Sequence, residues 1–517
     1  MPNPLYDRLF GRHAGRTTPF LHLPDGTAVS YADFLSDAAR MANVLVQRGL
    51  EPGDRIAAQV EKSPDALALY AACVQSGIIF LPLNTAYTTE ELAYFVEDSG
   101  SQLVVCDSGK EAQLTDMAEA LGASIMTLDA NGTGTFAEAA NTMPSTFATA
   151  PRETNDIAAL LYTSGTTGRS KGAMLTQGNL LSNAETLVEC WRFDQDDVLL
   201  HALPIFHTHG LFVATNVVLM AGGSMIFLPK FDVDDIIGQL PAATSMMGVP
   251  TFYTRLLDHP RLTPDLVAHM RLFTSGSAPL LSETHVRFEK ATGHRILERY
   301  GMTETNMNTS NPYEGERRAG TVGFPLPGVE LKITDPETGE ELAQGQVGQI
   351  EVRGPNVFAG YWQMPEKTAA ELRDNGFFIT GDLGRIDEDG YVHIVGRNKD
   401  LIISGGYNIY PKEIELILDE QPGVIESAVI GVPHADFGES VVGLIVPKPG
   451  ETPDLEAIKS AVGNRLARFK QPRKLLLLDD LPRNTMGKVQ KNVLRDAYSK
   501  LFMDEPAARQ DVEAGSK

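Results

Sequence analysis

Residues 30–128 alternate between helical periodicity and short apolar runs, and this pattern constrains the fold more than any other feature of the chain. Helices are predicted from Ser30 to Gly49 and from Ser63 to Gly77, each begun by a serine and ended by a glycine. Short apolar runs predict buried strands at 55–60, 78–83, 103–106 and 124–128. Between them the pattern predicts further helices at 88–98 and 111–121. Strands joined through helices pair in parallel by right-handed crossovers, so the pattern predicts an α/β fold.

The 517-residue chain is long enough for more than one hydrophobic core. Residues 130–155, rich in Ala, Thr, Asn and Pro, are expected to form a surface connection. Alternation then resumes, with strands expected at 244–249, 272–275 and 295–300. Between about 319 and 396 glycine and proline become frequent and strands shorten, which is typical of a small β-rich subdomain. A compact C-terminal α/β unit follows, with helices 411–419 and 454–466 and strands 425–432 and 441–446.

We therefore expect three parts. The first is a large N-terminal domain, 1–396, made of α/β subdomains and the small β-rich subdomain. The second is a small, mobile C-terminal α/β domain, 397–502. Residues 503–517 have the composition of a disordered tail.

Charge and cysteine content exclude several classes of protein. A net charge of −23 argues against a nucleic-acid-binding surface, which needs clustered Lys and Arg. Cys73, Cys106 and Cys190 lie far apart in apolar contexts without metal-ligand spacing, which favours free thiols in a reducing compartment. The N-terminus lacks a signal-peptide apolar region, and no run of 18 apolar residues exists. We expect a cytoplasmic location, with neither nucleic acid nor membrane as a partner.

The apolar run from Ile157 to Tyr162 leads into a segment rich in glycine and hydroxyl groups, Thr163 to Lys171. Glycines allow the backbone to approach a ligand closely, and the hydroxyls and cations suit a polyanion such as a triphosphate. Two residues separate Gly168 from Lys171, so the segment does not match the P-loop rule. It is interpreted as a phosphate-binding loop of another kind, with a polar hairpin turn as the alternative.

Six further polar motifs punctuate the chain: PIFHTHG (204–210), SGSAPL (275–280), ERYGMTE (298–304), TGDLGR (380–385), GRNKDLIISGGYNIYPKEIE (396–415) and PRNTMGKVQK (482–491). Together with the loop they resemble, from about residue 5 to 498, the superfamily of acyl- and aryl-CoA synthetases, luciferases and peptide-synthetase adenylation domains. The resemblance implies an acid–thiol ligase that uses ATP, Mg²⁺ and coenzyme A. A carboxylate attacks the α-phosphorus of ATP to give an acyl-adenylate and pyrophosphate, and a thiol then displaces AMP.

The resemblance also implies which residues bind the nucleotide. Glu304 would hold Mg²⁺, Thr303 would contact the α-phosphate, and Asp382 would accept hydrogen bonds from both ribose hydroxyls with help from Arg397. The catalytic set is Lys488, Glu304, Thr303 and His207. The ATP/AMP-binding set is Thr163, Ser164, Gly165, Thr166, Thr167, Gly168, Lys171, Gly276, Ser277, Ala278, Glu298, Tyr300, Asp382 and Arg397.

Two half-reactions in one site imply a C-terminal domain that rotates. Lys488 matches the superfamily lysine that reaches the carboxylate and the α-phosphate, and its acetylation by an acetyltransferase, reversed by a deacetylase, would remove its charge. Lys399 corresponds to the hinge residue. Gly405 and Gly406 would then bring the backbone against the pantetheine arm of coenzyme A.

Two departures from the general pattern point to the acid. Arg299 stands where relatives that take fatty or aromatic acids commonly have an uncharged residue, and His209 is an additional polar residue after His207. Together they could clamp a second carboxylate at the distal end of the substrate, with the arginine binding bidentately. In the alternative, Arg299 pairs with Glu298 or another interior acid.

The segments around these residues resemble those of malonate-activating members, in which Thr208 and Met307 match positions that line the malonate methylene. Malonate, with methylmalonate as a second substrate, is therefore expected. The alternatives are another small carboxylic or dicarboxylic acid, a stand-alone enzyme that adenylates an amino acid and loads a carrier protein, and a non-catalytic nucleotide-binding homologue. Intact Lys488, Glu304 and Asp382 argue against the last.

Overall fold

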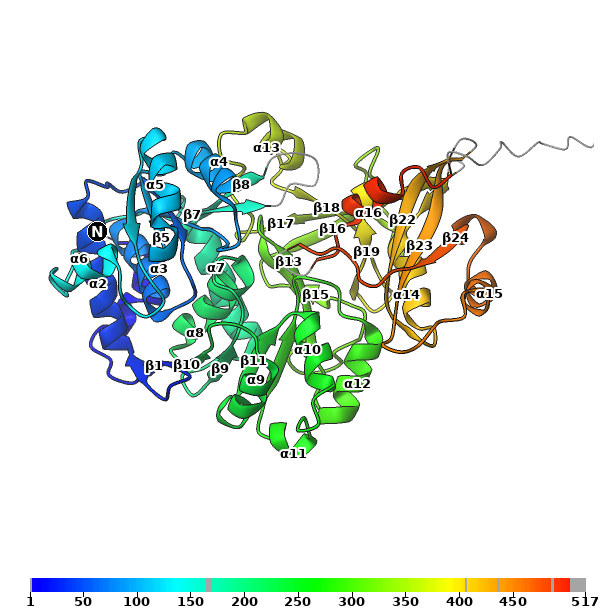
Figure 1. Cartoon of the computed structure of the whole chain (residues 1–517), viewed down its shortest axis with the longest axis horizontal. Helices are drawn as coiled ribbons and strands as arrows, with labels where there is room; N and C mark the ends of the chain where they lie inside the picture. The colour runs from blue at the N-terminus through cyan, green and yellow to red at the C-terminus, as the bar shows by residue number, and fades with distance from the viewer. Residues whose placement is uncertain (1, 164–169, 405–406, 435–436, 485–487, 503–517) are drawn as a thin grey trace, which may run out of the picture. The chain divides into compact units, whose positions relative to one another are not determined.

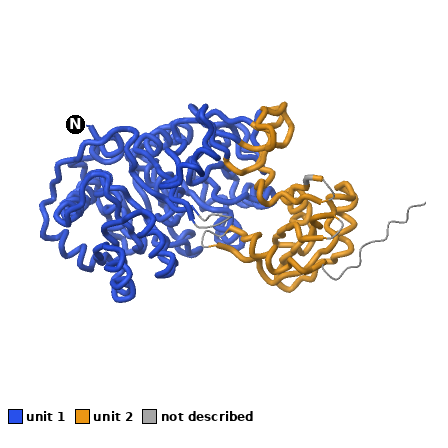
Figure 2. Tube along the Cα trace, turned by 90° about the horizontal axis from the view of Figure 1, so that it is seen from above, with its two compact units in different colours: residues 1–332, 351–379, 390–392 blue, residues 333–350, 380–389, 393–517 orange. Residues whose placement is uncertain are grey.

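The computed structural model describes residues 2–163, 170–404, 407–434, 437–484 and 488–502. It divides the chain into two compact units (Figure 2). Unit 1 comprises residues 1–332, 351–379 and 390–392, and unit 2 comprises 333–350, 380–389 and 393–517. Residues 333–350 and 380–389, which were expected in the N-terminal domain, fall in unit 2, so the chain passes between the units several times before residue 393. The boundary expected after 396 stays a prediction. The tail expected at 503–517 lies outside the described residues.

In the described part of unit 1, six strands form a sheet in the order β6-β5-β3-β4-β7-β8. The strands are β3 (Arg55–Gln59), β4 (Ile79–Pro82), β5 (Leu103–Cys106), β6 (Ser124–Thr127), β7 (Ile157–Thr163) and β8 (Lys171–Thr176). The pairs β6–β5, β5–β3, β3–β4 and β4–β7 are parallel, which confirms the α/β prediction. Strands β7 and β8 are antiparallel with Thr163 opposite Lys171, so the segment between them joins neighbouring strands. Residues 164–169 of the predicted loop lie outside the described residues.

Helices accompany this sheet (Figure 1). The pattern predicts α2 (Tyr31–Gln47), α3 (Pro64–Ser76), α4 (Thr89–Ser99) and α5 (Glu111–Ala120), whereas α1 (Pro4–Leu9) was not predicted. The side chain of Ser30 accepts the Asp33 N–H at the start of α2, and Ser63 accepts the Ala66 N–H at the start of α3. Gly77 ends α3 in the left-handed conformation, with φ of 75°. The predicted caps are confirmed.

The surface connection expected at 130–155 contains a helix, α6 (Thr135–Asn141), so this expectation is wrong in part. Gly134 precedes it with φ of 108°, and the Thr135 N–H donates to Thr127 Oγ1 at 2.9 Å. Phe136 is fully buried. A short alanine-rich segment has little periodicity of its own, and burial of one aromatic side chain stabilises the helix.

A second sheet in unit 1 has, among the described residues, the order β15-β14-β13-β12-β11-β9-β10-β1-β2. Its strands are β1 (Pro19–His22), β2 (Ala28–Ser30), β9 (Val198–His201), β10 (Ser224–Phe227), β11 (Ser245–Gly248), β12 (Leu272–Ser275), β13 (Leu297–Met302), β14 (Asn306–Ser310) and β15 (Phe324–Pro325). The central pairs are parallel and the outer pairs antiparallel. Parallel pairing of β12 with β13 brings the motifs that follow Ser275 and Glu298 to one edge of the sheet.

The remaining helices that surround this sheet are α7 (Gln177–Trp191), η3 (His209–Thr215), α8 (Asn216–Ala221), α9 (Val233–Gln239), α10 (Pro250–Leu257), α11 (Pro264–Val267) and α12 (Ser282–Thr292). Short 3₁₀ turns occur at η1 (Gly11–His13), η2 (Ser108–Lys110) and η4 (Leu240–Ala242). The segment η3 is a π-helix, which the sequence pattern did not predict. No helix among the described residues is long and apolar enough to cross a lipid bilayer.

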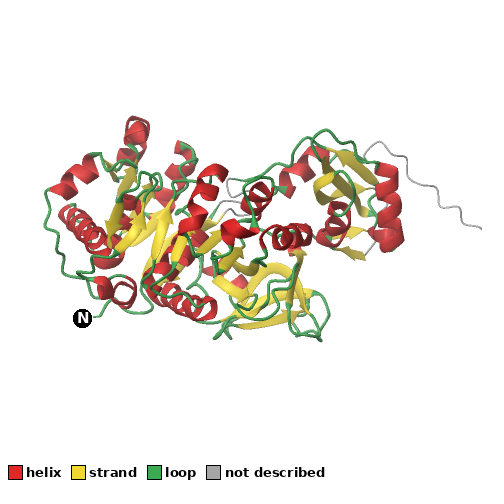
Figure 3. Cartoon of the chain, turned by 90° about the horizontal axis from the view of Figure 1, so that it is seen from below, coloured by secondary structure: helices red, strands yellow, loops and turns green. Residues whose placement is uncertain are grey.

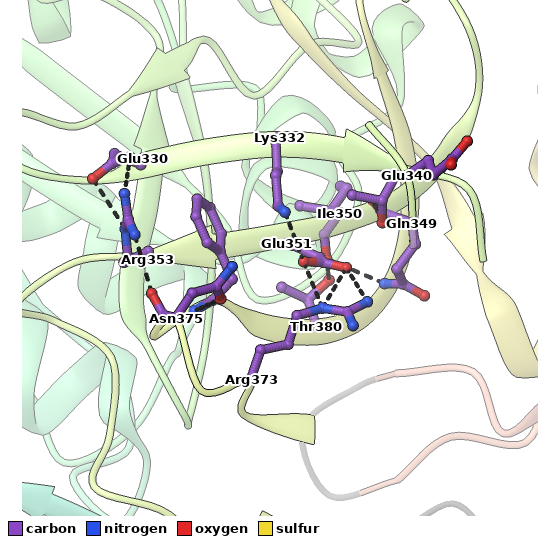
Figure 4. Close-up of polar contacts among 12 residues, drawn as sticks. Glu330, Lys332, Glu340, Gln349, Ile350, Glu351, Arg353, Arg373, Asn375 and Thr380 are labelled. Carbon is purple, nitrogen blue, oxygen red and sulfur yellow. Dashed lines mark hydrogen bonds and ion pairs between the residues drawn. The ribbon is translucent and has the colours of Figure 1, made fainter. Parts of the chain in front are cut away.

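The β-rich region predicted at 319–396 is confirmed as a four-stranded sheet in the order β16-β17-β18-β19 within the described chain. It comprises β16 (Glu330–Thr334), β17 (Gly348–Arg353), β18 (Phe378–Ile386) and β19 (Val392–Arg397), with helix α13 (Pro365–Glu371) between β17 and β18. The Glu351 carboxylate is completely buried and accepts hydrogen bonds from Arg373 at 2.6–3.0 Å, while Lys332 Nζ lies 3.4 Å away (Figure 4). Two cations thus neutralise one buried acid.

The C-terminal part of unit 2 is an α/β layer whose described strands have the order β21-β20-β23-β22, with β24 against β23. Its elements are η5 (Asn398–Asp400), β20 (Ile402–Ser404), β21 (Tyr407–Ile409), α14 (Pro411–Asp419), β22 (Val424–His434), β23 (Gly438–Pro447), α15 (Leu455–Arg465), η6 (Arg468–Lys470), β24 (Lys474–Leu477) and α16 (Lys491–Tyr498). Alternate residues of β23 face two cores: Val441 packs with α14 and α15, and Val442 packs with Leu494 of α16. Helices therefore cover both faces of this sheet (Figure 3).

The buried Glu351 yields a stability prediction. Glu351→Ala leaves Arg373 and Lys332 without their shared acid, and breaking a fully buried pair costs about 3–5 kcal/mol. Because these two cations are 38% and 18% exposed, we expect the free energy of unfolding, measured by urea denaturation, to fall by a smaller amount, about 2 kcal/mol. Glu330→Ala, which breaks an exposed pair with Arg353 on the same sheet, is the control and should cost much less. Equal losses of unfolding free energy in the two variants would contradict the view that the buried Glu351 ion pairs stabilise the fold more than the exposed pair does.

Candidate functional site

Arg299 is a buried cation with unused hydrogen-bond donors. It lies on β13 with 4% of its surface exposed, and neither Nε nor Nη2 has a hydrogen-bond partner among the described residues. Burial lowers the pKa of Arg299 to about 9, although Tyr253 acts in the opposite direction. The guanidinium is therefore still charged at neutral pH. A charged group held out of water with free donors is a receptor for an anion, and a carboxylate matches its bidentate geometry.

Gly276 makes room for this guanidinium. A Cβ atom at position 276 would lie 2.0 Å from Arg299 Nη1 and 2.3 Å from Cζ. Any side chain here would therefore displace the cation. Gly276, from the predicted ATP/AMP-binding set, and the predicted acid-binding Arg299 are thus direct neighbours.

The geometry does not support pairing of Arg299 with Glu298. Neighbouring residues of a strand point to opposite faces, and Glu298 has other partners. Its Oε1 accepts the Gly320 N–H at 3.3 Å and lies 3.4 Å from His285 Nδ1. Burial raises the pKa of Glu298, and His285 partly opposes this effect. Its predicted role in nucleotide binding remains a prediction.

His209 begins the π-helix η3 and faces the same region as Arg299. Its Nδ1 lies 3.1 Å from Ser277 Oγ, and its Nε2 is buried without a hydrogen-bond partner in the described structure. Burial, followed by the charge of Arg299, holds the pKa of His209 well below its ordinary value. The imidazole is therefore neutral and can donate or accept one further hydrogen bond. His207 is adjacent, because its Nδ1 accepts the His209 N–H at 3.4 Å.

Thr208 and Met307 occupy neighbouring buried positions. Thr208 Oγ1 donates to Asn306 Oδ1 at 2.5 Å, and Asn306 has a left-handed backbone with φ of 49°. The Met307 carbonyl accepts hydrogen bonds from Asn183 at 3.0 Å and from Asn356 at 3.1 Å. A Cβ at Gly301 would lie 2.5 Å from Met307 Cε, so glycine lets the methionine pack against β13.

A second group of residues brings Lys171 and Glu304 together. Tyr361 Oη lies 3.0 Å from Glu304 Oε1 and 2.6 Å from Glu371 Oε2. Lys171 Nζ is 3.6 Å from Glu371 Oε1 and 4.2 Å from the centre of the Tyr361 ring. Burial and these two carboxylates raise the pKa of Tyr361, which therefore keeps its proton. Sequence reasoning missed Tyr361 and Glu371, because one tyrosine and one helical glutamate carry no chemical signal in a single sequence.

Glu304 fits the role predicted for it toward Mg²⁺. Its carboxylate is nearly buried and offers the hard oxygen ligands that Mg²⁺ prefers. No cluster of three His, Cys, Asp or Glu side chains in the described residues could hold a metal ion alone. A single carboxylate suits Mg²⁺ that is bound mainly through substrate phosphates and water. Thr303 lies in the turn before Glu304, and Tyr300 lies on β13 opposite Thr309.

Unit 2 holds the remaining predicted residues. Asp382 is buried, and its Oδ1 lies 2.9 Å from Arg397 Nε, so the two predicted ribose-binding residues contact each other. Burial lowers the pKa of Lys399 to about 8, Asp400 opposes this effect, and Arg397 adds to it. The Lys488 N–H donates to Asn484 Oδ1 at 2.9 Å, and its carbonyl accepts the Asn484 N–H. Gly405 and Gly406, like Ser164, Gly165, Thr166, Thr167 and Gly168, lie outside the described residues.

Comparison with known proteins covers nearly the whole chain. The family model "AMP-binding enzyme" matches residues 10–362, and "AMP-binding enzyme C-terminal domain" matches residues 413–488. A malonate–CoA ligase of Arabidopsis thaliana is 35% identical, with 91% of this chain and 85% of that protein covered. A long-chain-fatty-acid–CoA ligase of Bacillus subtilis is also 35% identical, with 90% of each chain covered. The crystal structure of ATP-bound MatB from Rhodopseudomonas palustris is 58% identical, with a TM-score of 0.95 and coverage of 97% of this chain and 100% of that one.

The depressed pKa of His209 yields a prediction on stability against pH. The unfolded chain binds a proton at this histidine near pH 6.5 and the folded chain does not, so stability is lost as pH falls below about 6.5. In His209→Gln this contribution disappears. We expect its free energy of unfolding to decline less steeply between pH 6.5 and pH 5, by up to about 1.4 kcal/mol per pH unit. Chemical denaturation at several pH values measures this, and parallel profiles for the two proteins would contradict it.

Proposed function

This chain belongs to the AMP-binding enzyme family, and we propose that it joins malonate, and also methylmalonate, to coenzyme A at the expense of ATP. The products are malonyl-CoA, AMP and pyrophosphate. The observation that carries the choice of acid is Arg299, a buried guanidinium with two unused donors beside a neutral His209. The malonate–CoA ligase of Arabidopsis thaliana supports the same substrate.

The two carboxylates of malonate have different partners in this proposal. Arg299 and His209 bind the distal carboxylate, and Thr208 and Met307 line the methylene. The proximal carboxylate is left to attack the α-phosphorus of ATP, with His207 and Thr303 beside the reacting groups. A fatty or aromatic acid would leave the Arg299 charge buried without an anion, which is costly. The proposed site therefore selects its substrate by charge.

Each part of the nucleotide has its own proposed contacts. Lys171 and the loop that precedes it bind the β- and γ-phosphates, the Gly276–Ala278 backbone and Tyr300 bind the adenine, and Asp382 with Arg397 binds the ribose. Mg²⁺ held by Glu304 supplies charge neutralisation as an anionic nucleophile meets a polyanion. Lys488 stabilises the charge that develops between the carboxylate and the α-phosphorus. Most of the catalysis is positioning and electrostatics.

The thiol step uses the same bound adenylate in a second arrangement of the C-terminal domain. Lys399 is the hinge in this proposal, and Gly405 and Gly406 approach the pantetheine arm. Lys399 is partly buried, and its ammonium interacts with the charges of Asp400 and Arg397. A few residues at an element boundary absorb the change in backbone angles.

An amino-acid adenylation enzyme fits the site less well. Such an enzyme needs an acidic side chain for the ammonium group of its substrate, whereas the proposed acid-binding residues include the Arg299 cation. We further propose a cytoplasmic location, in keeping with three unpaired cysteines, and control by acetylation of Lys488.

Removal of the proposed clamp tests the acid assignment. Arg299→Met should lower kcat/KM for malonate by about 30-fold or more, since truncating one partner of a buried charge pair costs about 2–5 kcal/mol. Propionate, which lacks the second carboxylate, is the matched control substrate and should be used as well as before or better. Coupled detection of AMP with both acids measures this. A variant that keeps the wild-type preference for malonate would refute the clamp.

Lys488→Ala tests the proposed division between the half-reactions. The rate of adenylate formation, measured by malonate-dependent pyrophosphate exchange, should fall by several orders of magnitude. Thioester formation from preformed malonyl-AMP should be largely retained. Lys500→Ala, at an exposed lysine close to α16, is the control and should leave both steps unchanged. Equal loss of both half-reactions in Lys488→Ala would exclude this role.

A further inference from the structure

Glu371, the last residue of α13, contacts the cation proposed to bind the triphosphate. Its Oε1 lies 3.6 Å from Lys171 Nζ, and the same ammonium lies 4.2 Å above the centre of the Tyr361 ring. The side chains of Lys171 and Glu371 are 20% and 23% exposed. Lys171 is therefore held from two sides at a position with restricted access to water, where an ion pair is screened less than on an open surface.

Two further contacts hold Glu371 in place. Tyr361 Oη donates to its Oε2 at 2.6 Å, and Lys367 Nζ, one turn earlier on α13, lies 2.6 Å from its Oε1. Lys367 is 43% exposed and is the more solvent-accessible of the two lysines. Burial opposes ionisation of Glu371, but the hydrogen bonds from Lys367 and Tyr361, together with the charges of Lys171 and Lys367, lower its pKa overall, so the carboxylate stays ionised.

This arrangement suits an exchange of partners. If Lys171 moves to a phosphate, Lys367 and the Tyr361 hydroxyl remain on Glu371, so its carboxylate is not left without compensation. Without ATP, the ammonium is kept beside Tyr361, whose hydroxyl also contacts Glu304. The same phenol thus links the proposed triphosphate cation to the proposed Mg²⁺ ligand.

We propose that Glu371 is a positioning residue that holds the Lys171 ammonium in the ATP-free protein and releases it to the triphosphate. This inference rests on the proposed function, in which Lys171 binds the β- and γ-phosphates. Glu371 and ATP are competing anions for one cation. Lys367 also pairs with Glu371, and it thereby weakens the hold of Glu371 on Lys171.

The competition predicts opposite changes in ATP affinity, measured by calorimetry with ATP and Mg²⁺ in the absence of a carboxylic acid. Glu371→Gln keeps a hydrogen-bond acceptor for Tyr361 but removes the competing charge, so the Kd for ATP should fall about threefold to tenfold. Lys367→Gln leaves Glu371 more dependent on Lys171, so the Kd should rise by a similar factor. Glu366→Gln removes an exposed carboxylate of the same helix and is the matched control, with an unchanged Kd expected.

A double variant separates this role from a structural one. In a Lys171→Gln background, Glu371→Gln should change the Kd less than twofold, because the cation for which the anions compete is absent. If Glu371→Gln alone matches Glu366→Gln, or keeps its full effect in the Lys171→Gln background, the positioning role is wrong. If Lys171→Gln alone binds ATP as the wild type does, the proposed phosphate contact itself is wrong. Thermal unfolding of each variant confirms that the protein is folded.

Discussion

The buried guanidinium of Arg299 in unit 1 constrains the residues around it. A guanidinium out of water without a permanent acid partner is tolerated only where its surroundings add no further cost. Gly276 supplies space, His209 stays neutral, and Glu298 is directed to His285 and Gly320 instead. Among the described residues the guanidinium thus has no acid partner, and in the proposed function the second carboxylate of the substrate supplies one.

The two ends of the proposed reaction are organised by different physical means. At the acid end, we propose that the buried charge of Arg299, whose Nε and Nη2 have no hydrogen-bond partner among the described residues, selects the substrate. At the phosphate end, Lys171, Tyr361, Glu371 and Lys367 form a chain of mutually compensated groups in which partners can be exchanged. The first arrangement provides discrimination, and the second keeps charges compensated while a polyanion enters.

Much of the fold could be predicted because its local signals agree with its packing. The caps at Ser30, Ser63 and Gly77 and the short apolar strands all indicate parallel α/β structure, and tertiary contacts reinforce each of them. Helix α6 was missed because burial of Phe136, rather than periodicity, stabilises it. The π-helix at His209 depends on a close approach in which Gly210 has no room for a Cβ beside the Pro204 carbonyl, and no pattern in a single sequence encodes that contact. Arg299 could be singled out because relatives commonly have an uncharged residue at its position. Tyr361 and Glu371 acquire meaning only through their contacts with Lys171 and Glu304.

The backbone conformation of Ser277 affects which substitutions this position accepts. It is a serine with φ of 70°, a conformation that costs a residue with a side chain on the order of 1 kcal/mol and that glycine adopts freely. Its hydroxyl is also the group that meets His209 Nδ1. Replacement by glycine would relax the backbone and remove that hydroxyl at the same time. Relief of backbone strain and retention of the contact with His209 Nδ1 therefore oppose each other at this position.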